Sequence, residues 1–416
     1  MKKTLFTILA LAALLLSACQ AEKKSEGPPA VKLMIVQGPD LITPDGEKFF
    51  IKGTNFGNWI NPEGYMFGFR KTNSVRFINE MFCQLVGPDF TAEFWKTFKD
   101  NYITRKDVQF VKKTGSNTIR IPFHYKLFTD EDYMGLTVNQ DGFARIDSIV
   151  EWCRAEGLYV ILDMHDAPGG QTGDNIDDSY GYPWLFESAA SQKLYCDVWR
   201  KIADYYKYEP VILGYELFNE PIAPYFENME ALNAKMKDVY KMGIKAIREV
   251  DKEHIILLGG SQWNGNFNPL RNVEFNDDKL MYTCHRYGGE PTPDAIRDFI
   301  VFRDSVNRPM YMGEIGHNTN EWMAAFCKTM EDNNIGWTFW PYKKMDGSCF
   351  ASVVPPEGWD KIIEFSEAPR VTYKDIRDAR PNQEEAKAIM LKMLEQCKFE
   401  NNHIEEGYIR ALGLNP

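Results

Sequence analysis

Two glutamates that follow separate apolar runs have the chemistry of a paired-carboxylate catalyst. Glu220 ends the run ILGYELFNE, and Glu314 ends the run PMYMGE. Hydrolysis of a glycosidic bond needs two carboxylic acids: one protonates the leaving oxygen, and the other attacks the anomeric carbon or activates water. We expect Arg120 to hold one carboxylate ionised and to lower its pKa by roughly 1–3 units, while the like charge raises the pKa of the other.

Other polar and aromatic side chains occupy the ends of further apolar runs. A lone polar residue at a strand end is more often a cap or an ion-pair partner than a functional group. With the run that ends at Glu314, six strand ends carry such groups, which favours a shared site. The residues expected to bind and orient a substrate are Arg120, His165, Asn219, His285, Tyr287 and Trp340.

Eight short apolar runs alternate with segments that have helical periodicity, which is typical of parallel βα folds. An open doubly wound sheet shows the same alternation, but no GxGxxG or GxxxxGK follows any of these runs. We therefore predict the α/β class and a closed (β/α)₈ TIM barrel, in which the carboxyl ends of all strands meet at one mouth. The predicted strands are residues 49–59, 118–124, 159–165, 212–220, 254–260, 280–287, 309–317 and 336–343.

Two long segments interrupt the alternation after the first and third predicted strands. Residues 60–103 are rich in aromatics, and residues 166–190 are rich in Gly and Asp. Long loops without a regular pattern are usually functional or disordered, and these follow strand ends, where barrel sites are built. We assign residues 31–370 to the barrel domain, with its last helix near residues 358–366. Residues 371–416 are expected to form a C-terminal helical extension packed on the barrel, with a helix at 383–397.

The joint set of strand-end residues resembles glycoside hydrolase family 5, the cellulase family of clan A. The residues that carry the resemblance run in the family's order between about residues 49 and 343. They are Arg120, His165, Asn219 and Glu220 in FNEP, His285 and Tyr287 in HRY, Glu314 in GEIG and Trp340 in WTFW.

The resemblance implies a retaining double displacement without a cofactor or metal. Glu220 would be the acid/base, Glu314 the nucleophile, and Tyr287 a hydrogen-bond partner of the nucleophile. Asn219 would hold the sugar 2-hydroxyl. His165 and His285 would bind and orient the substrate, and Trp340 would form the floor of the subsite where the bond breaks.

The segment HDAPGGQTGDNIDDS (165–179) resembles the corresponding loop of the exo-β-1,3-glucanase branch of the family, which favours a β-glucan bound near a chain end. Endo- and exo-action both remain open. The acidic residues of this loop are an alternative calcium site, although EF-hand spacing and a closing Glu are missing; they are Asp174, Asn175, Asp177 and Asp178. Four tryptophans are either sugar platforms or buried structural residues: Trp59, Trp184, Trp263 and Trp359.

Composition points to a neutral, non-nucleic-acid partner. The chain has 48 Lys and Arg against 59 Asp and Glu, with a net charge of −11, which argues against binding a phosphate backbone. Aromatic residues make up 14% of the chain, which suits stacking on carbohydrate. The eight cysteines have no CxxC or metal-ligand spacing. We expect a monomer whose partners are a polysaccharide or oligosaccharide and a membrane.

The N-terminus has the pattern of a secretory signal that ends in a lipidation site. Residues 1–18 comprise a basic start, a short apolar stretch and small residues before Cys19. The tetrad LSAC resembles the bacterial lipoprotein motif, in which the cysteine receives a lipid. Residues 19–30 are polar and Pro-rich, as in a flexible tether. We therefore expect a lipid-anchored protein of the cell envelope, at the outer-membrane surface or in the periplasm.

Two rival functions fit the same barrel. One is a surface carbohydrate-binding lipoprotein without turnover, since a fold alone never proves activity. The other is a metal-dependent hydrolase that uses Asp163, His165, His285 and Glu314, although the sequence has no His-x-His or HExxH pair.

Overall fold

The computed structural model describes residues 31–135 and 141–416. Residues Leu33–Pro416 form one compact unit. The predicted signal peptide, Cys19 and the tether lie outside the described residues. Within the described part of the chain, no helix combines the length and the apolar character needed to cross a bilayer.

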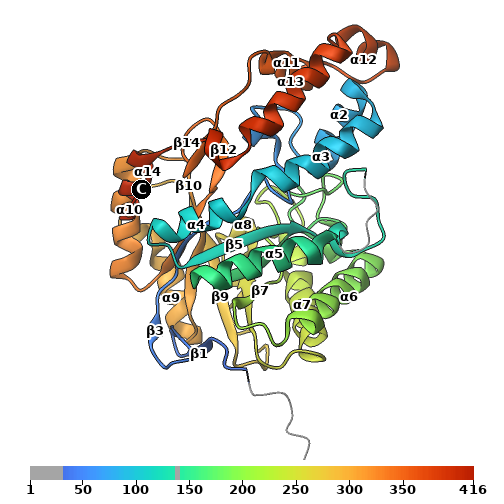
Figure 1. Ribbon diagram of the computed structural model, residues 1–416. Helices are drawn as coiled ribbons and strands as arrows, with labels where there is room; N and C mark the ends of the chain where they lie inside the picture. The colour runs from blue at the N-terminus through green and yellow to red at the C-terminus, as the bar shows by residue number, and fades with distance from the viewer. Residues whose placement is uncertain (1–30, 136–140) are drawn as a thin grey trace, which may run out of the picture. The chain divides into compact units, whose positions relative to one another are not determined.

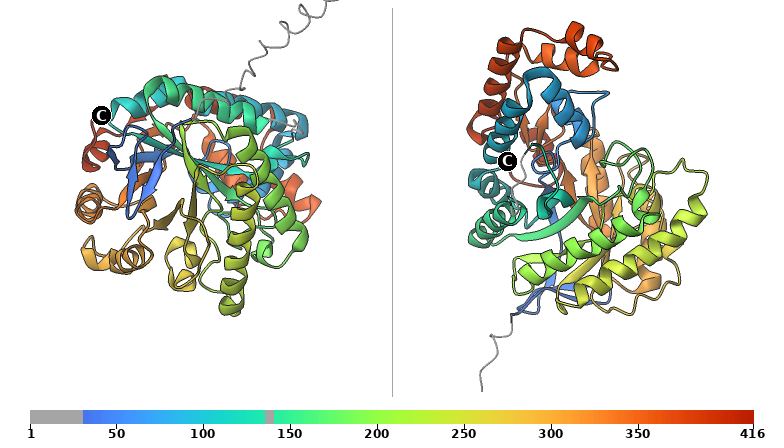
Figure 2. Two further views of the ribbon diagram at one scale, coloured as in Figure 1. Left: turned by 90° about the horizontal axis from the view of Figure 1, so that it is seen from below. Right: turned by 90° about the vertical axis from the view of Figure 1, so that its right-hand side faces the viewer.

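Eight parallel strands close into a barrel that is surrounded by helices (Figures 1 and 2). The prediction of a (β/α)₈ barrel is confirmed, and each predicted run overlaps one barrel strand. Around the barrel the strands are β4 (Lys52–Asn55), β5 (Thr118–His124), β6 (Tyr159–Asp166), β7 (Ile212–Glu216), β8 (Ile255–Gly259), β9 (Leu280–His285), β10 (Met310–Gly316) and β11 (Gly336–Trp340).

The helices follow the strands in the expected order, with short helices in the loops. The α-helices before the C-terminal region are α2 (Val75–Val86), α3 (Pro88–Tyr102), α4 (Arg105–Lys113), α5 (Asp141–Glu156), α6 (Ala189–Tyr206), α7 (Met229–Arg248), α8 (Ser261–Asn264), α9 (Arg297–Val306) and α10 (Asn320–Asp332). The 3-10 helices among them are η1 (Gly64–Phe67), η2 (Tyr125–Phe128), η3 (Trp184–Phe186), η4 (Asn268–Leu270) and η5 (Pro293–Ile296).

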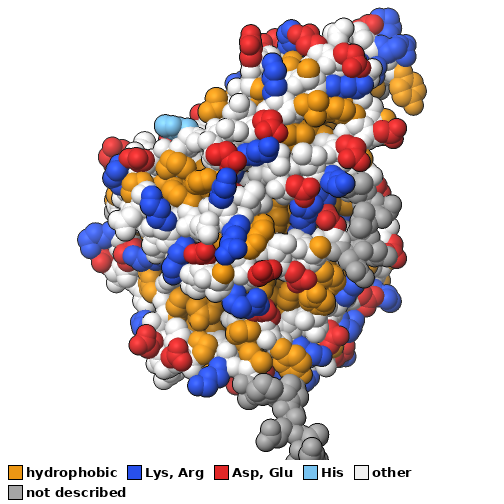
Figure 3. Space-filling view, viewed as in Figure 1, with side chains coloured by type: hydrophobic (Ala, Val, Ile, Leu, Met, Phe, Trp, Pro, Cys, Tyr) orange, Lys and Arg blue, Asp and Glu red, His pale blue; other side chains and the backbone are white. Residues whose placement is uncertain are grey.

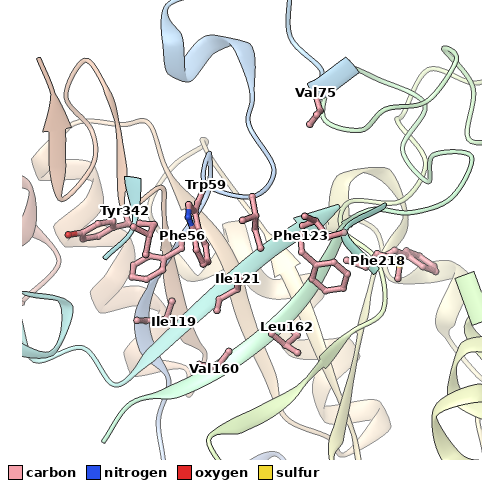
Figure 4. Close-up of a cluster of buried hydrophobic side chains, with 14 of the residues drawn as sticks. Phe56, Trp59, Val75, Ile119, Ile121, Phe123, Val160, Leu162, Phe218 and Tyr342 are labelled. Atoms are coloured by element: carbon pink, nitrogen blue, oxygen red, sulfur yellow. The ribbon is translucent and has the colours of Figure 1, made fainter. Parts of the chain in front are cut away.

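Strand β5 shows how the barrel positions polar groups inside itself. All seven of its residues are buried, as expected of a parallel strand covered on both faces. Ile119, Ile121 and Phe123 belong to one apolar cluster with Leu162 of β6 (Figure 4). Because side chains alternate along a strand, Arg120 lies on the opposite face, toward the barrel interior.

A second apolar cluster fills the end of the barrel interior away from the site. It joins strand residues such as Ile161, Leu257 and Met281 to Leu41 of a small N-terminal sheet. That sheet consists of β1 (Ile35–Gln37), β2 (Asp40–Ile42) and β3 (Lys48–Phe49), and the sequence pattern did not predict it. The sheet therefore closes the bottom of the barrel.

The excursion after β4 is largely helical, which corrects the expectation of a long loop without regular structure. Residues 60–103 contain η1, α2 and α3. Ile78, Phe82 and Leu85 recur at helical spacing on the buried face of α2. Residues 166–190, after β6, hold only η3 and the start of α6, so this second excursion is the irregular loop that the sequence predicts.

The C-terminal region contains α11 (Trp359–Glu367), α12 (Tyr373–Ala379), α13 (Gln383–Gln396), η6 (Phe399–Asn401) and α14 (Glu406–Ala411), together with a sheet of β12 (Lys343–Met345), β13 (Ala351–Val353) and β14 (His403–Ile404). Helix α13 packs against α2 and α3 (Figure 1). The buried Lys343 Nζ donates to the carbonyls of Tyr102 at 2.7 Å and Cys397 at 3.1 Å. The extension thus rests on the helices inserted after β4.

Candidate active site

The structure brings all eight predicted site residues to the carboxyl end of the barrel. Arg120, His165, His285, Glu314 and Trp340 lie on strands β5, β6, β9, β10 and β11. Strand β7 is shorter than predicted and ends at Glu216, so Asn219 and Glu220 follow it; Tyr287 likewise follows β9. A cavity of about 350 Å³ opens here. Its lining is Glu63, Tyr65, His165, Ile176, Asn219, Glu220, Tyr287, Glu314, His317 and Trp340.

Arg120 lies fully buried beneath the cavity and binds several carboxylates at once. Its Nε and Nη2 donate to the two oxygens of Glu216 at 2.8 and 2.7 Å. Nη1 donates to Glu314 Oε1 at 2.8 Å, and Nη2 donates to Asn219 Oδ1 at 2.8 Å. Nη2 also lies 3.0 Å from Asp163 Oδ2. The planar fork of the guanidinium thus fixes Glu314 and Asn219 relative to each other.

Glu314 is held from both sides. Arg120 occupies its Oε1, and the Tyr287 hydroxyl donates to its Oε2 at 2.5 Å. Burial raises the pKa of Glu314 above its ordinary value, although Arg120 and the Tyr287 hydrogen bond both favour the ionised form. The expected lowering of this pKa is therefore wrong, because desolvation outweighs the arginine.

Glu220 has the more strongly raised pKa of the two glutamates. Burial is the largest cause of this increase in pKa, followed by the negative charges of Glu314 and Glu63. Its Oε1 lies 2.8 Å from His285 Nδ1. Burial lowers the pKa of His285 well below its usual value, so this imidazole is neutral at physiological pH. Since the pKa of Glu220 rises further than that of Glu314, Glu314 ionises first.

The two glutamates face each other at short range. One carboxyl oxygen of each glutamate and one ring nitrogen of His285 lie within 4.8 Å of one another. Retaining glycosidases place their carboxyl groups roughly 5–5.5 Å apart, whereas inverting enzymes leave about 6.5–9.5 Å for a water molecule. A closest approach this short favours the retaining arrangement.

The loop after β6 fixes the backbone that carries Glu220. Gln171 Nε2 donates to the carbonyl of Asn219 at 2.9 Å, and Thr172 Oγ1 donates to that of Glu220 at 2.8 Å. Glu220 itself has a φ of 42°, in the left-handed region that non-glycine residues rarely adopt. The loop thus holds a strained turn that aims the carboxyl group into the cavity.

Trp340 and His165 both line the cavity, and their rings stack on each other. Their rings lie 5.3 Å apart with an interplanar angle of 3°. Trp340 Nε1 donates to the Tyr65 hydroxyl at 2.7 Å, and a Cβ at Gly57 would lie 2.7 Å from the indole, so the ring is fixed from beneath. His165 Nδ1 lies 2.7 Å from Asp163 Oδ2.

Several residues of the site were not predicted from the sequence. Glu63 lines the cavity, is buried, and has no hydrogen-bond partner for its Oε1 among the described residues. Asn55 and Glu216 bind Arg120 from inside the barrel. Asn264 Nδ2 lies 3.1 Å from His285 Nε2. Of these residues, only Glu63 could have been suspected from the sequence, because it is a polar residue in the excursion that follows the first predicted strand.

A second cavity, of about 560 Å³, shares Glu220 and Tyr287 with the first, whereas Glu314 lines only the first. Glu220, His285 and Tyr287 line it together with Trp263, which is 38% exposed.

The structure distinguishes buried structural residues from exposed ones among the four tryptophans considered as sugar platforms. Trp59 and Trp359 are buried and donate to backbone carbonyls, so they are structural. Trp184 and Trp263 are exposed near the mouth.

The acidic loop residues proposed as a calcium site make hydrogen bonds within the protein. Asp177 Oδ2 accepts from the backbone N–H of Thr172 at 2.6 Å, and Asp178 Oδ1 accepts from that of Arg76 at 2.9 Å. Among the described residues, the side chains close enough together to share a metal ion are Glu220, His285 and Glu314, and not those of the acidic loop.

Comparison with known proteins identifies the family. The model of the cellulase family, glycosyl hydrolase family 5, matches residues 79–346. The chain is 28% identical to a beta-xylosidase of Phanerodontia chrysosporium over 70% of its own length and 58% of the relative's length. It is 27% identical to Endoglucanase C of Acetivibrio thermocellus over 61% of its own length and 88% of the relative's. It is 26% identical to a glucan 1,3-beta-glucosidase of Kluyveromyces lactis over 58% of each chain. The chain therefore belongs to the cellulase family, glycosyl hydrolase family 5.

Proposed function

We propose that this protein hydrolyses the β-glycosidic bonds of a β-glucan by a retaining double displacement. The observation that carries the proposal is the close pair of Glu220 and Glu314, held by different partners at the mouth of the barrel. A pair of carboxyl groups whose environments separate their pKa values is the general pattern of acid/base assignment.

Glu314 is the proposed nucleophile. It forms a bond to the anomeric carbon while the glycosidic bond breaks, and Glu220 gives its proton to the leaving oxygen. In the second step Glu220 takes a proton from water, the water oxygen bonds to the anomeric carbon, and Glu314 is released. Arg120 and Tyr287 stabilise the carboxylate of Glu314 before the first step and after the second.

The sugar that loses its aglycone lies in the cavity of about 350 Å³. Trp340 offers its face as the floor. Asn219, whose Oδ1 is occupied by Arg120, has its Nδ2 on the side of His165 and the cavity, where a 2-hydroxyl would bind. Glu63 Oε1 is buried without a partner among the described residues, and a sugar hydroxyl would satisfy it.

A β-glucan is the substrate class best supported. Two of the three relatives described above are named for activity on glucans. The loop of residues 165–179 favours binding near a chain end. The charged side chains on the face in Figure 3 mix both signs, and the cavity itself is lined by aromatic and carboxylic side chains, which suits a neutral polymer.

The experiment that tests the proposal is a product profile. The protein without its tether is incubated with β-1,3-, β-1,4- and mixed-linked glucans, xyloglucan and mannan, with Glu314→Gln as the blank. Release of mono- or oligosaccharide from a glucan supports the proposal and assigns the linkage. Binding of a glucan without product from any polymer would instead support a carbohydrate-binding protein.

No metal is part of this mechanism, although Glu220, His285 and Glu314 are close enough to share one. Glu314 is already occupied on both oxygens, by Arg120 and by Tyr287. Hydrolysis is expected to be unchanged after dialysis against a chelator; loss of activity that zinc restores would favour the metal-dependent alternative.

The location proposed for this protein is the cell envelope, with Cys19 as the lipidated residue. The support is the LSAC tetrad after a signal-like stretch. Metabolic labelling with a palmitate analogue, compared between the full chain and Cys19→Ser, tests it. The monomer remains a proposal as well, supported by the fact that one chain supplies every residue of the site.

A further inference from the structure

Five aromatic side chains form a continuous strip from the second cavity across two loops. In order they are Trp263, Tyr225, Phe226, Tyr182 and Trp184, and we call them the aromatic strip. Successive ring centroids are 6.4, 5.1, 5.4 and 4.7 Å apart. Trp263, Tyr225 and Trp184 are 38%, 56% and 45% exposed, and the two rings between them are half-buried. An exposed aromatic surface of this extent marks an interaction site.

The strip begins in the second cavity, which is lined by Glu220 and not by Glu314. Because Glu220 is the proposed acid/base, which protonates the leaving oxygen, the leaving group belongs in this cavity. Trp263 lines that cavity together with Glu220 and His285. It lies in a turn where Gln262, Trp263 and Asn264 all have φ values of 56–57°. Asn264 anchors the turn at His285, so the indole is fixed relative to the acid/base. Strain of this kind is kept where a function requires it.

The rest of the strip is held rigid before any ligand binds. Asn228 Nδ2 donates to the Tyr182 hydroxyl at 2.6 Å, and this hydroxyl donates to Glu187 Oε1 at 3.1 Å. Phe226 packs so closely on Gly173 that a Cβ there would lie 2.6 Å from the ring. Rings fixed in advance bind at a low cost in conformational entropy.

The chemistry of the strip fits a neutral glycan. Aromatic faces stack on the apolar faces of sugar rings. The neighbouring charges Lys235 and Glu187 neutralise each other at 2.7 Å. Because the strip continues from the cavity beside Glu220, the sugars bound to it would belong to the part of the substrate that leaves.

We propose that the aromatic strip binds the leaving-group side of a β-glycan chain over several sugar units. This inference rests on the proposed function. It implies that the enzyme favours long chains over short glycosides, because much of the binding energy comes from sugars outside the cavity where the bond breaks.

The test compares polymers with substrates too short to reach the strip. Laminarin and barley β-glucan are the polymers, and p-nitrophenyl β-glucoside and p-nitrophenyl β-cellobioside are the short substrates. The variants are Trp184→Ala and Tyr225→Ala, neither of which lines the catalytic cavity. Tyr373→Ala is the control, an 82% exposed aromatic on α12. The ratio of polymer to aryl-glycoside kcat/KM is expected to fall at least fivefold in both strip variants and to stay unchanged in the control. A ratio within twofold of the native value in both variants would overturn the proposal.

A binding measurement separates failure of the strip from failure of the catalytic proposal. In the Glu314→Gln background, affinity electrophoresis through laminarin or barley β-glucan reports polymer binding without turnover. Adding Trp184→Ala should reduce the retardation at least fivefold, whether or not the native protein hydrolyses the polymer. If the strip variants keep full polymer binding and instead lose adsorption to phosphatidylcholine vesicles, the strip is a membrane contact and the proposal is wrong.

Discussion

Glu220 and Glu314 come within 4.8 Å of each other through their carboxyl oxygens. Their surroundings differ: Glu314 binds a guanidinium and a tyrosine hydroxyl, and Glu220 lies against a neutral imidazole. This asymmetry assigns the ionised role to Glu314 and the protonated role to Glu220, and most of the predictions below depend on it.

Replacing Glu314 with Gln removes the nucleophile and keeps the shape of the side chain. We expect turnover to fall by about four orders of magnitude or more. Binding of the polymer should remain, because the amide leaves the cavity lining intact. Initial rates and affinity electrophoresis on the same preparation check this; a variant with a near-native rate would refute the role of Glu314.

The pH dependence of kcat/KM should be bell-shaped. Activity needs ionised Glu314, so it is lost as the pH falls through the raised pKa of that residue. Activity also needs protonated Glu220, so it is lost as the pH rises through the more strongly raised pKa of Glu220. A flat profile between about pH 4 and 9 would contradict both assignments.

Tyr287→Phe tests the acid limb of that profile directly. The hydroxyl donates to Glu314 at 2.5 Å and favours its ionised form. Without it the pKa of Glu314 rises, so the acid limb should move to higher pH and kcat/KM should fall about 10- to 100-fold. An acid limb that does not move would show that Tyr287 acts through packing alone.

Arg120→Lys should destabilise the fold as well as the site. Lys keeps the charge but lacks the fork that binds Glu216, Glu314 and Asn219 in a fully buried position. We expect the free energy of unfolding to fall by about 3 kcal/mol or more. Arg410→Lys is the matched control, because its pair with Glu406 is exposed; its effect should stay within about 0.5 kcal/mol. Urea denaturation of both variants measures these changes in the free energy of unfolding. Equal losses in the two variants would contradict a special role for the buried guanidinium.

Glu63→Ala separates a binding role from a structural one. The buried Oε1 has no partner in the described part of the chain, so removing it should leave the melting temperature unchanged or higher. If a sugar hydroxyl binds this oxygen, kcat/KM should fall about 10- to 100-fold for every substrate that is cleaved. A loss of stability with normal kinetics would assign Glu63 to the fold instead.

The barrel could be predicted from the sequence because parallel strands buried on both faces leave continuous apolar runs. Strand β5 matches its predicted bounds, Thr118–His124. The sheets β1–β3 and β12–β14 were missed because strands of two or three residues are too short to show a period. The helices α2 and α3 were hidden among the many aromatics of the first excursion, whose apolar positions at helical spacing were not recognised.

The site residues at the ends of predicted strands could be identified from the sequence. Those whose role depends on burial inside the barrel could not. Glu216 is the last residue of β7 but lies inside the predicted apolar run 212–220, and only the closed barrel turns it toward Arg120. The direction of the Glu314 pKa shift was wrong because the arginine is visible in the sequence, whereas the extent of burial is not. Asn264 reaches His285 through a turn of left-handed residues, which no local pattern predicts.

The most direct test of the central claim is the anomeric configuration of the first product, followed by proton NMR during hydrolysis of a β-linked glucan or aryl β-glucoside. Two displacements at one carbon restore the starting configuration, so the account predicts that the β-anomer appears first and that the α-anomer follows only through mutarotation. Initial release of the α-anomer would show a single displacement by water and would contradict the role of Glu314 as nucleophile.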